Sequence, residues 1–194
     1  MKNYLFVLSL LVWQSSAAQL TDAEIRDWKS GRFPDDTSHV YQLPYRQGER
    51  YLLVQGSNTK FSHKGELAHD FKMKTGTPVC AVRDGLVEAA RGDSERGGLK
   101  DEFLTEGNYI MIRHADGSLA QYWHFRKDGV LVAVGDSVKA GQLVGYSGNT
   151  GYSAFPHLHL QFVDAGGRQI LARFRTKKGI IYLRPGNWYR AVSP

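Results

Sequence analysis

The stretch GNYIMIRHADGSLAQYWHF, residues 107–125, carries two apolar runs on either side of an AspGly pair. The first run, TyrIleMetIleArgHis, begins at residue 109, and the second, LeuAlaGlnTyrTrpHisPhe, begins at residue 119. An AspGly pair between two such runs is typical of the tight turn of a β-hairpin. The stretch therefore predicts two neighbouring antiparallel strands, of which the second leads to His124.

Further short apolar runs lie on both sides of this hairpin, separated by polar turns. They are ValCysAlaVal from residue 79, LeuValGluAlaAla from 86, ValLeuValAlaVal from 130, GlnLeuValGlyTyr from 142 and HisLeuHisLeuGlnPheVal from 157. Short strands at this spacing, with 21 glycines for turns, are typical of an all-β domain with mostly antiparallel pairing. The polar residues 91–107 predict a long loop. A short N-terminal helix is expected over residues 21–30, where Thr21 and Glu24 form a capping-box pattern.

The first residues, MKNYLFVLSLLVWQSSAAQL, have the layout of a secretory signal peptide. Lys2 precedes an apolar run, and small residues follow that run up to Ala18. The run is too short to span a bilayer as a helix, which needs about 20 residues, so we expect cleavage after Ala18. The alternative is a retained membrane anchor. The sequence therefore predicts an exported protein, periplasmic or secreted.

About 176 residues remain after residue 18, enough for one domain with a substantial core. We expect an N-terminal extension over residues 19–54, the main domain over 55–166, and a basic C-terminal segment over 167–194 that packs on the domain or extends it. Cys80 is the one cysteine, so no intrachain disulfide can form, and its apolar neighbours predict burial. The core, which a metal site could reinforce, must hold the fold together.

Positive charge is concentrated near the C-terminal end. The formal net charge is +6, or +5 without Lys2. Residues 165–194 contain no Asp or Glu, and seven basic residues lie there: Arg168, Arg173, Arg175, Lys177, Lys178, Arg184 and Arg190. Such a face favours an anionic partner such as a cell wall, an anionic lipid surface or nucleic acid. The alternative is a solvated strand surface with no partner.

Residues 149–162, NTGYSAFPHLHLQF, place two of the seven histidines in one predicted strand. Side chains alternate between the two faces of a strand, so His157 and His159 point the same way, with Cα atoms about 6.5–7 Å apart. If a metal ion binds at about 2.1 Å from a ring nitrogen of one of these histidines, the other histidine lies beside the metal ion. Two same-face histidines at a strand edge are usually surface residues, so this pair alone is weak evidence for a metal site.

Three other stretches strengthen the case. SHKGELAHDFKMKTGTPVCAVRDGLV, residues 62–87, contains His63 and Asp70, which could supply a nitrogen and an oxygen ligand. The hairpin leads to His124, and GDSVKAGQLVGYSGNTG, residues 135–151, leads into the strand with the histidine pair. In this order and spacing the motifs resemble the LytM/lysostaphin family of zinc endopeptidases, peptidase family M23, which cut the peptide part of bacterial cell walls. The resemblance covers about residues 55–164.

Carried over residue by residue, the resemblance makes His63, Asp70 and His159 the zinc ligands. His124, which matches the family's Tyr-X-His motif, and His157 then become the catalytic histidines. Three protein ligands leave a fourth position open for water, as a catalytic zinc requires. Such a site acidifies water and polarises the scissile carbonyl, while the two histidines can transfer protons and stabilise the oxyanion. The resemblance thus implies one zinc ion per chain, in an open groove walled by loops on an antiparallel sheet.

The chain departs from the family pattern at two places. Six residues intervene between His63 and Asp70, where family members commonly have three, although variants with the longer spacing end in a run like AlaHisAspPhe. His69 is the rival ligand, but adjacent strand residues face opposite ways, so we do not expect it to share a metal with Asp70. SerAlaPheProHis replaces the usual SerThrGlyProHis, which bears on the shape of the groove and hence on the substrate.

Three further residues have simpler interpretations. His114 precedes the AspGly turn and is expected to form a local hydrogen bond, and His39 is expected at the surface. Tyr122 shares a predicted strand face with His124, so it could line the groove or pack in the core.

The sequence therefore predicts an exported zinc metalloendopeptidase that hydrolyses peptide bonds of peptidoglycan, in the stem peptide or the cross-bridge. We expect a monomer that binds peptidoglycan, and an anionic wall or membrane surface through residues 167–194, but no nucleic acid. The alternative is a wall-binding regulator of the same fold without hydrolytic activity, against which the presence of all five site residues counts. A biotinyl or lipoyl carrier domain, suggested by GlyAspSerValLysAlaGlyGln from residue 135, ranks last because its histidines would have no role.

Overall fold

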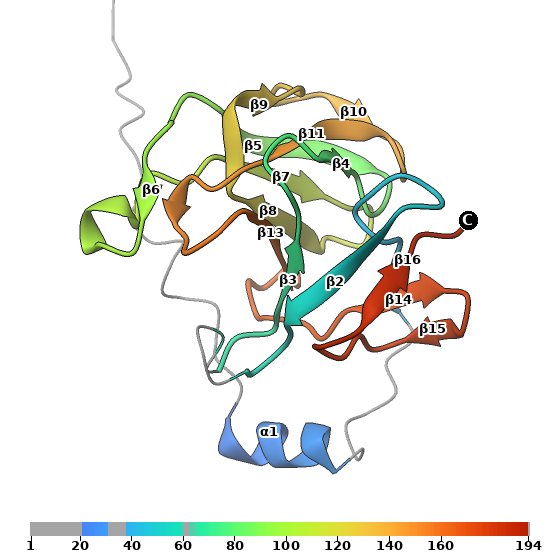
Figure 1. Cartoon of the computed structure of the whole chain (residues 1–194). Coiled ribbons are helices and arrows are strands. Elements are labelled where there is room, and N and C mark those ends of the chain that lie inside the picture. The colour runs from blue at the N-terminus through green and yellow to red at the C-terminus, as the bar shows by residue number, and fades with distance from the viewer. Residues whose placement is uncertain (1–20, 31–37, 60–62, 64, 194) are drawn as a thin grey trace, which may run out of the picture.

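The computed structural model describes residues 21–30, 38–59, 63 and 65–193 (Figure 1). The predicted signal peptide, residues 1–18, lies outside the described residues. Among those described, no helix is long and apolar enough to cross a membrane. Helix α1, Asp22–Lys29, begins with the expected capping box: the backbone N–H of Thr21 donates to Glu24 Oε2 (2.8 Å), and the backbone N–H of Glu24 donates to Thr21 Oγ1 (3.3 Å).

Eight strands form the main sheet, in the order β10-β5-β7-β8-β13-β3-β2-β16, and every neighbouring pair is antiparallel. Their bounds are β2 Arg50–Gln55, β3 Ala68–Lys72, β5 Gly85–Arg91, β7 Tyr109–Arg113, β8 Leu119–Trp123, β10 Ser137–Val138, β13 His157–Val163 and β16 Trp188–Arg190. The predicted hairpin is β7 and β8, with Tyr109 opposite Trp123. The expected all-β, mostly antiparallel fold is confirmed.

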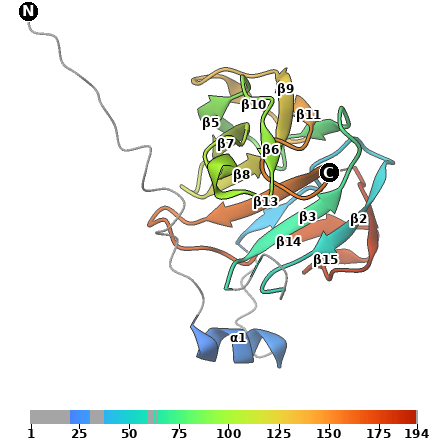
Figure 2. The same cartoon turned by 60° about the vertical axis from the view of Figure 1, so that its left-hand side comes forward.

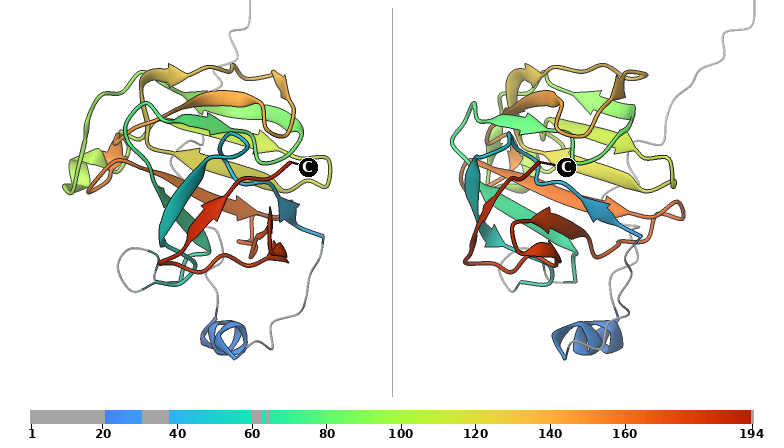
Figure 3. Two further views of the ribbon diagram at one scale, coloured as in Figure 1. Left: turned by 45° about the vertical axis from the view of Figure 1, so that its right-hand side comes forward. Right: turned by 90° about the vertical axis from the view of Figure 1, so that its right-hand side faces the viewer.

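Smaller sheets in the described part of the chain pack beside the main sheet (Figures 2 and 3). One contains β4 (Pro78–Cys80), β11 (Leu143–Ser147) and β9 (Phe125–Val130), and another contains β1 (Val40–Tyr41), β14 (Arg173–Thr176) and β15 (Gly179–Ile181). In addition, β12 (Gly151–Tyr152) pairs in parallel with β6 (Gly97–Gly98). The predicted long loop of residues 91–107 thus contains β6 and the 3-10 helix η1, Asp101–Phe103.

The main core lies between these layers. It combines buried side chains from the main sheet with buried side chains from the two three-stranded sheets, among them Phe71, Leu158, Val79, Val144 and Phe174. Cys80 is buried, as predicted, and its thiol is free. Burial of apolar side chains from all three sheets holds the layers together without a disulfide among the described residues.

Strand β13 separates the core from the opposite face of the main sheet. Leu158 and Leu160 are fully buried in the core, whereas His157 and His159 alternate with them and point the other way. Asp70 of β3 pairs directly with His159, so it lies on that same face. We call this the site face of the main sheet.

The apolar run of residues 130–134 does not form the predicted strand. Strand β9 covers the preceding polar residues instead and ends at Val130. Beyond it, Leu131 and Val134 are 50% and 64% exposed, so these side chains are not buried against another element. Strand β9 contains an AspGly pair, and Asp128 has a φ of 52°. Because such a pair normally indicates a turn, the sequence pattern does not predict a strand there.

Candidate functional site

Neighbouring strands bring the predicted site residues together. His159 of β13 pairs with Asp70 of β3 on one side and with Trp123 of β8 on the other. Directly paired residues of a sheet point to the same face, so His159 and Asp70 project together away from the core. His63 lies in the loop before β3, and His124 directly follows β8. With His157, all five predicted site residues meet at the site face.

His63, Asp70 and His159 form one compact group, which we call the ligand group. Their donor atoms lie within 4.8 Å of one another. Nε2 of His63 is 3.2 Å from Asp70 Oδ2, and Nδ1 of His159 is 2.9 Å from Asp70 Oδ1. Two imidazoles and one carboxylate are a donor set that catalytic zinc uses in proteins. The chemistry and the closeness of these atoms therefore fit a metal ion.

Each member of the ligand group has a second partner that holds its orientation. His63 Nδ1 donates to the carbonyl of Gly56 (3.1 Å), which leaves Nε2 facing the carboxylate. Gln55 Nε2 donates to Oδ2 of that carboxylate (2.8 Å). Nε2 of His159 lies 3.4 Å from Gln161 Oε1, on the side of the ring away from the group. Outer partners of this kind fix the tautomer and the ring orientation of metal ligands.

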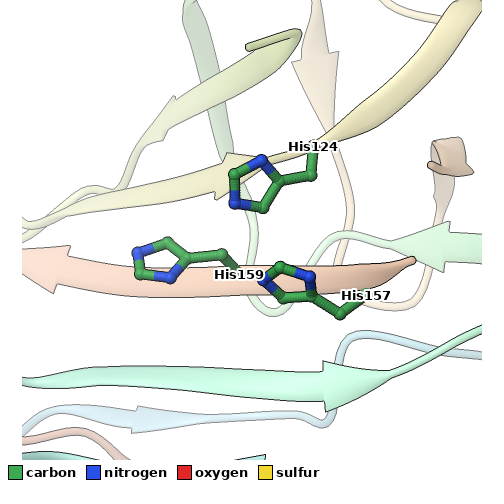
Figure 4. A group of neighbouring side chains, drawn as sticks. All are labelled: His124, His157 and His159. Atoms are coloured by element: carbon green, nitrogen blue, oxygen red, sulfur yellow. The ribbon is translucent and has the colours of Figure 1, made fainter. Parts of the chain in front are cut away.

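His124 and His157, which we call the histidine pair, lie beside His159 of the ligand group (Figure 4). One ring nitrogen from each of these two residues and one from His159 also lie within 4.8 Å of one another. Nδ1 of His124 donates to the Thr150 carbonyl (2.7 Å), and Nδ1 of His157 donates to the Phe155 carbonyl (2.8 Å). In both rings Nε2 is left as the acceptor nitrogen, and Nε2 of His157 is 3.6 Å from the ligand-group carboxylate.

The site combines an ionised carboxylate with one imidazole whose charged form is favoured and two whose neutral form is favoured. Burial opposes a charge on Asp70, but hydrogen bonds with His159 and His63 outweigh it and hold the pKa of Asp70 well below its usual value. Burial also opposes a charge on His159, while the hydrogen-bonded carboxylate raises its pKa to about 9. Burial, with the two neighbouring imidazoles, lowers the pKa of His124 to about 3, and burial lowers the pKa of His157. The histidine pair is therefore uncharged at pH 7.

His124 has an uncommon backbone conformation. Its φ is +71°, in the left-handed region that residues other than glycine rarely adopt. Simple strand alternation would place it on the core face with Tyr122, which is fully buried and accepts a hydrogen bond from the Val82 N–H (2.9 Å). Strand β8 ends at Trp123, and the N–H of His124 donates to the Asn108 carbonyl (2.9 Å). The left-handed residue thus turns the imidazole to the site face, and Tyr122 belongs to the core.

The remaining histidines lie away from the site. His69 packs in the core, with its ring centroid 5.0 Å from that of Phe174. Strand alternation predicts this position for the neighbour of a site-face residue. His114 Nδ1 donates to the Asp84 carbonyl (2.8 Å), the expected local hydrogen bond. His39 is half-buried rather than at the surface.

Sequence reasoning missed the groups that orient the site. Gln55 and the carbonyls of Gly56 and Thr150 reach the site through the fold, and no local pattern marks them. Gln161 did have a signal, because it occupies the next site-face position of the strand after His159. Its Nε2 donates to Gln121 Oε1 (2.8 Å), which turns its own Oε1 toward the imidazole.

A family model and several known proteins match the part of the chain that contains the site. The model of Peptidase family M23 matches residues 62–170, more than half of the chain. Glycyl-glycine endopeptidase ALE-1 from Staphylococcus capitis is 41% identical over 121 residues, which cover 62% of this chain and 29% of that protein. Peptidoglycan DD-endopeptidase ShyA from Vibrio cholerae is 37% identical over 97 residues, which cover 50% of this chain and 20% of that protein. A crystal structure of a zinc containing peptidase from Vibrio cholerae is 26% identical with a TM-score of 0.50, over 68% of this chain and 39% of that one.

The match to the family and the site geometry agree. The matched residues 62–170 contain all five predicted site residues, and the fold around them is the expected antiparallel one. This chain spans less than a third of the length of the two curated relatives. The sequence-based resemblance is confirmed: the chain belongs to peptidase family M23, a family of metalloendopeptidases.

Proposed function

We propose that this chain is a zinc-dependent endopeptidase that hydrolyses peptide bonds of bacterial peptidoglycan. The observation that carries the proposal is that the ligand group and the histidine pair share one sheet face, with His159 within 4.8 Å of both sets of donor atoms. The names of two relatives, a glycyl-glycine endopeptidase and a peptidoglycan DD-endopeptidase, support the substrate class. These names refer to different bonds, so the proposal covers both the stem peptide and the cross-bridge.

We assign the metal to His63, Asp70 and His159 rather than to the three imidazoles of His124, His157 and His159. The first set includes a carboxylate, which offsets the charge of a divalent cation in a buried site. Each of its members also has an outer partner of the kind that metal ligands use. A zinc ion held there would supply Lewis acidity toward the scissile carbonyl and would lower the pKa of a water molecule.

The histidine pair can perform the proton transfers of hydrolysis. A backbone carbonyl fixes Nδ1–H of each ring, so Nε2 of each presents a lone pair toward the ligand group. One imidazole takes a proton from water as the water oxygen bonds to the scissile carbonyl carbon. The other stabilises the negative charge on the carbonyl oxygen when its own Nε2 carries a proton, because only an N–H can donate to an oxyanion. The carbon–nitrogen bond then breaks, and the proton passes from the imidazole to the leaving amine.

We propose the following organisation for the whole chain. Residues 1–18 are a signal peptide, 19–54 an N-terminal extension, 55–166 the endopeptidase domain, and 167–194 a basic segment that packs on the domain or extends it. The protein is exported to the periplasm or the medium and acts as a monomer. The pairing of β2 with β3 and of β16 with β2 supports the view that both flanking segments pack on the domain.

We also propose that the basic C-terminal segment adds affinity for an anionic wall or membrane surface. Exposed charges are screened beyond about 10 Å at 0.1 M salt, so binding to isolated cell walls should weaken as salt is added. Replacing Arg173, Arg175, Lys177 and Lys178 by glutamine should reduce that binding and leave cleavage of a small soluble peptide unchanged. Wall binding that is independent of salt and survives the substitution would contradict this role.

The test of the proposed function is digestion of purified peptidoglycan, with mass spectrometry of the released muropeptides. The protein with bound zinc should produce new amine and carboxyl ends at one type of peptide bond, which identifies the bond. Chelator treatment should abolish the products, and added zinc should restore them. Wall binding without any cleaved bond, in protein shown to carry zinc, would favour the regulator alternative instead.

A further inference from the structure

The site face of the main sheet continues beyond the ligand group onto two more strands. In register, His157 of β13 pairs with Lys72 of β3, Lys72 pairs with Leu52 of β2, and Leu52 pairs with Trp188 of β16. Directly paired residues point to the same face, so this row runs from the histidine pair to the edge of the sheet. Arg190 pairs with Arg50 in the next same-face row. Figure 3 shows β16, in red, beside β2.

Strand β16 is fixed in place by its inward side and leaves its outward side free. The Leu53 N–H donates to the Asn187 carbonyl (2.9 Å), and the Tyr45 hydroxyl donates to the Tyr189 carbonyl (2.7 Å). Tyr189 packs against the core. Strand alternation therefore turns the two flanking residues, Trp188 and Arg190, to the site face. This strand lies outside residues 62–170, the part that matches the family model.

The outward residues form an aromatic and cationic surface, which we call the β16 patch: Arg50, Leu52, Lys72, Trp188 and Arg190. Trp188 is 60% exposed, and the guanidinium of Arg50 lies over its ring, with Cζ 5.5 Å from the centroid. The Arg190 guanidinium donates to the Gly48 carbonyl, which limits its motion. Within the described part of the chain, no ion pair involves Arg50, Lys72 or Arg190. Their charge is available to a ligand.

The distance along the row suits a peptide. Three strand spacings of about 4.8 Å separate Trp188 from His157, or about 14 Å in all. An extended peptide covers that distance with about four residues. A substrate cut beside the histidine pair and lying across β3 and β2 would therefore place a group a few residues from the scissile bond over the patch.

We propose that the β16 patch is a substrate subsite that binds a carboxylate of the peptide substrate. The inference rests on the proposed function, because it takes the ligand to be the molecule that is cleaved. Guanidinium groups bind carboxylates through paired, charge-assisted hydrogen bonds, and the exposed indole offers an apolar surface to the adjoining chain. Lys72, at the inner end of the patch, pairs directly with His157, so the row reaches the site without a break. The carboxylate belongs to an acidic residue or a peptide terminus.

The test compares one soluble cross-linked muropeptide with the same muropeptide after its carboxylates have been converted to amides. For the protein with bound zinc, amidation should raise KM about tenfold and leave kcat unchanged, as expected for the loss of a charge-assisted hydrogen bond to an arginine pair. Arg50→Gln and Arg190→Gln should raise KM for the native muropeptide by a similar factor and remove its advantage over the amidated one. Trp188→Ala should raise KM for both.

Controls separate a binding role from a structural one. Arg50→Lys should keep much of the preference for the carboxylate, which a merely destabilised β16 would not do. Lys139→Gln removes an exposed cation directly after β10, at the edge of the main sheet opposite β16, and should leave both KM values unchanged. Equal KM values for the two muropeptides in the unaltered protein, or an undiminished preference in Arg50→Gln, would overturn the proposal.

Binding measured by calorimetry to His157→Ala distinguishes this inference from the proposed function. If the unaltered protein cleaves neither muropeptide but His157→Ala binds the native one more tightly, and Arg50→Gln in that background abolishes the preference, the subsite stands and the hydrolytic function fails. If cleavage occurs and amidation has no effect on binding or KM, the function stands and the subsite fails. If the protein recognised only the glycan, it would bind the native and the amidated muropeptide with equal affinity. That result would also overturn the proposal.

Discussion

The ligand group and the histidine pair share one sheet face, but the chain positions them differently. Asp70 and His159 sit opposite each other in regular strands, and side-chain partners such as Gln55 hold them. His124 follows the end of its strand at a positive φ, and backbone carbonyls hold both rings of the pair. Strand register thus places Asp70, His157 and His159, whereas a departure from regular strand geometry adds His124. The two parts should therefore fail separately when altered.

The largest effect is expected from loss of a ligand-group residue. His63→Ala or Asp70→Ala leaves two protein ligands, so zinc should fall from about one per chain to near zero, and activity should be lost with it. Metal analysis by mass spectrometry of the purified variants measures this. His69→Ala is the matched control, because His69 lies in the core beside Phe174 and should keep its zinc if the variant folds. Zinc loss in His69→Ala alone, with zinc retained in the other two, would reverse the ligand assignment.

A smaller effect is expected from His124→Ala. The ligand group is unchanged in this variant, so zinc content should stay at about one per chain, while kcat should fall about 10²- to 10⁴-fold, the range for a positioned acid or base. His39→Ala, a half-buried histidine away from the site, should keep both. Full activity in His124→Ala would show that His124 is not a catalytic residue.

Gln55→Ala tests the side-chain support of the ligand group. Removing an outer partner of a ligand typically lowers metal affinity about 10- to 100-fold, so the variant should lose zinc to a competing chelator sooner than the unaltered protein. At saturating zinc it should recover most of its activity. Gln142→Ala, at an exposed glutamine, should bind zinc with unchanged affinity. An unchanged affinity in Gln55→Ala would show that the hydrogen bond to Asp70 does not support the metal.

Gly151→Ala tests the backbone support of the histidine pair. Gly151 has φ +79°, and an added Cβ would lie 2.7 Å from Gly107 Cα, next to the Thr150 carbonyl that holds His124. The variant should lose about 1–3 kcal/mol of stability and some activity, with zinc content unchanged. Gly167→Ala has the same backbone strain, at φ +81°, with no atom within 4 Å of the added Cβ, and should keep its activity. Equal losses of activity in the two variants would assign the effect to strain alone.

The regular part of the site follows from sequence, because its causes are local. Alternation places His157 and His159 on one face and His69 on the other, and the AspGly turn predicts the β7–β8 hairpin. Alternation fails at His124, which it assigns to the core face, because one left-handed residue reverses the side chain's direction.

Other features depend on distant contacts that no local pattern records. Gln55 reaches Asp70 only after β2 and β3 pair, and Trp188 joins the site face only because β16 pairs with β2, more than 130 residues away in the sequence. The apolar run after Val130 shows the reverse error: its composition predicts a strand, but Leu131 and Val134 stay exposed and no strand forms there.

The most direct test of the separation between the two parts is the zinc content of His159→Ala and His157→Ala, measured side by side. These residues are two positions apart in one strand and point to the same face, so general damage to β13 should affect both variants alike. We predict near zero zinc per chain for His159→Ala, and about one zinc per chain with activity reduced about 10²- to 10⁴-fold for His157→Ala. Zinc retained in His159→Ala and lost in His157→Ala, or full activity in both, would contradict the assignment of metal binding and proton transfer to separate residues.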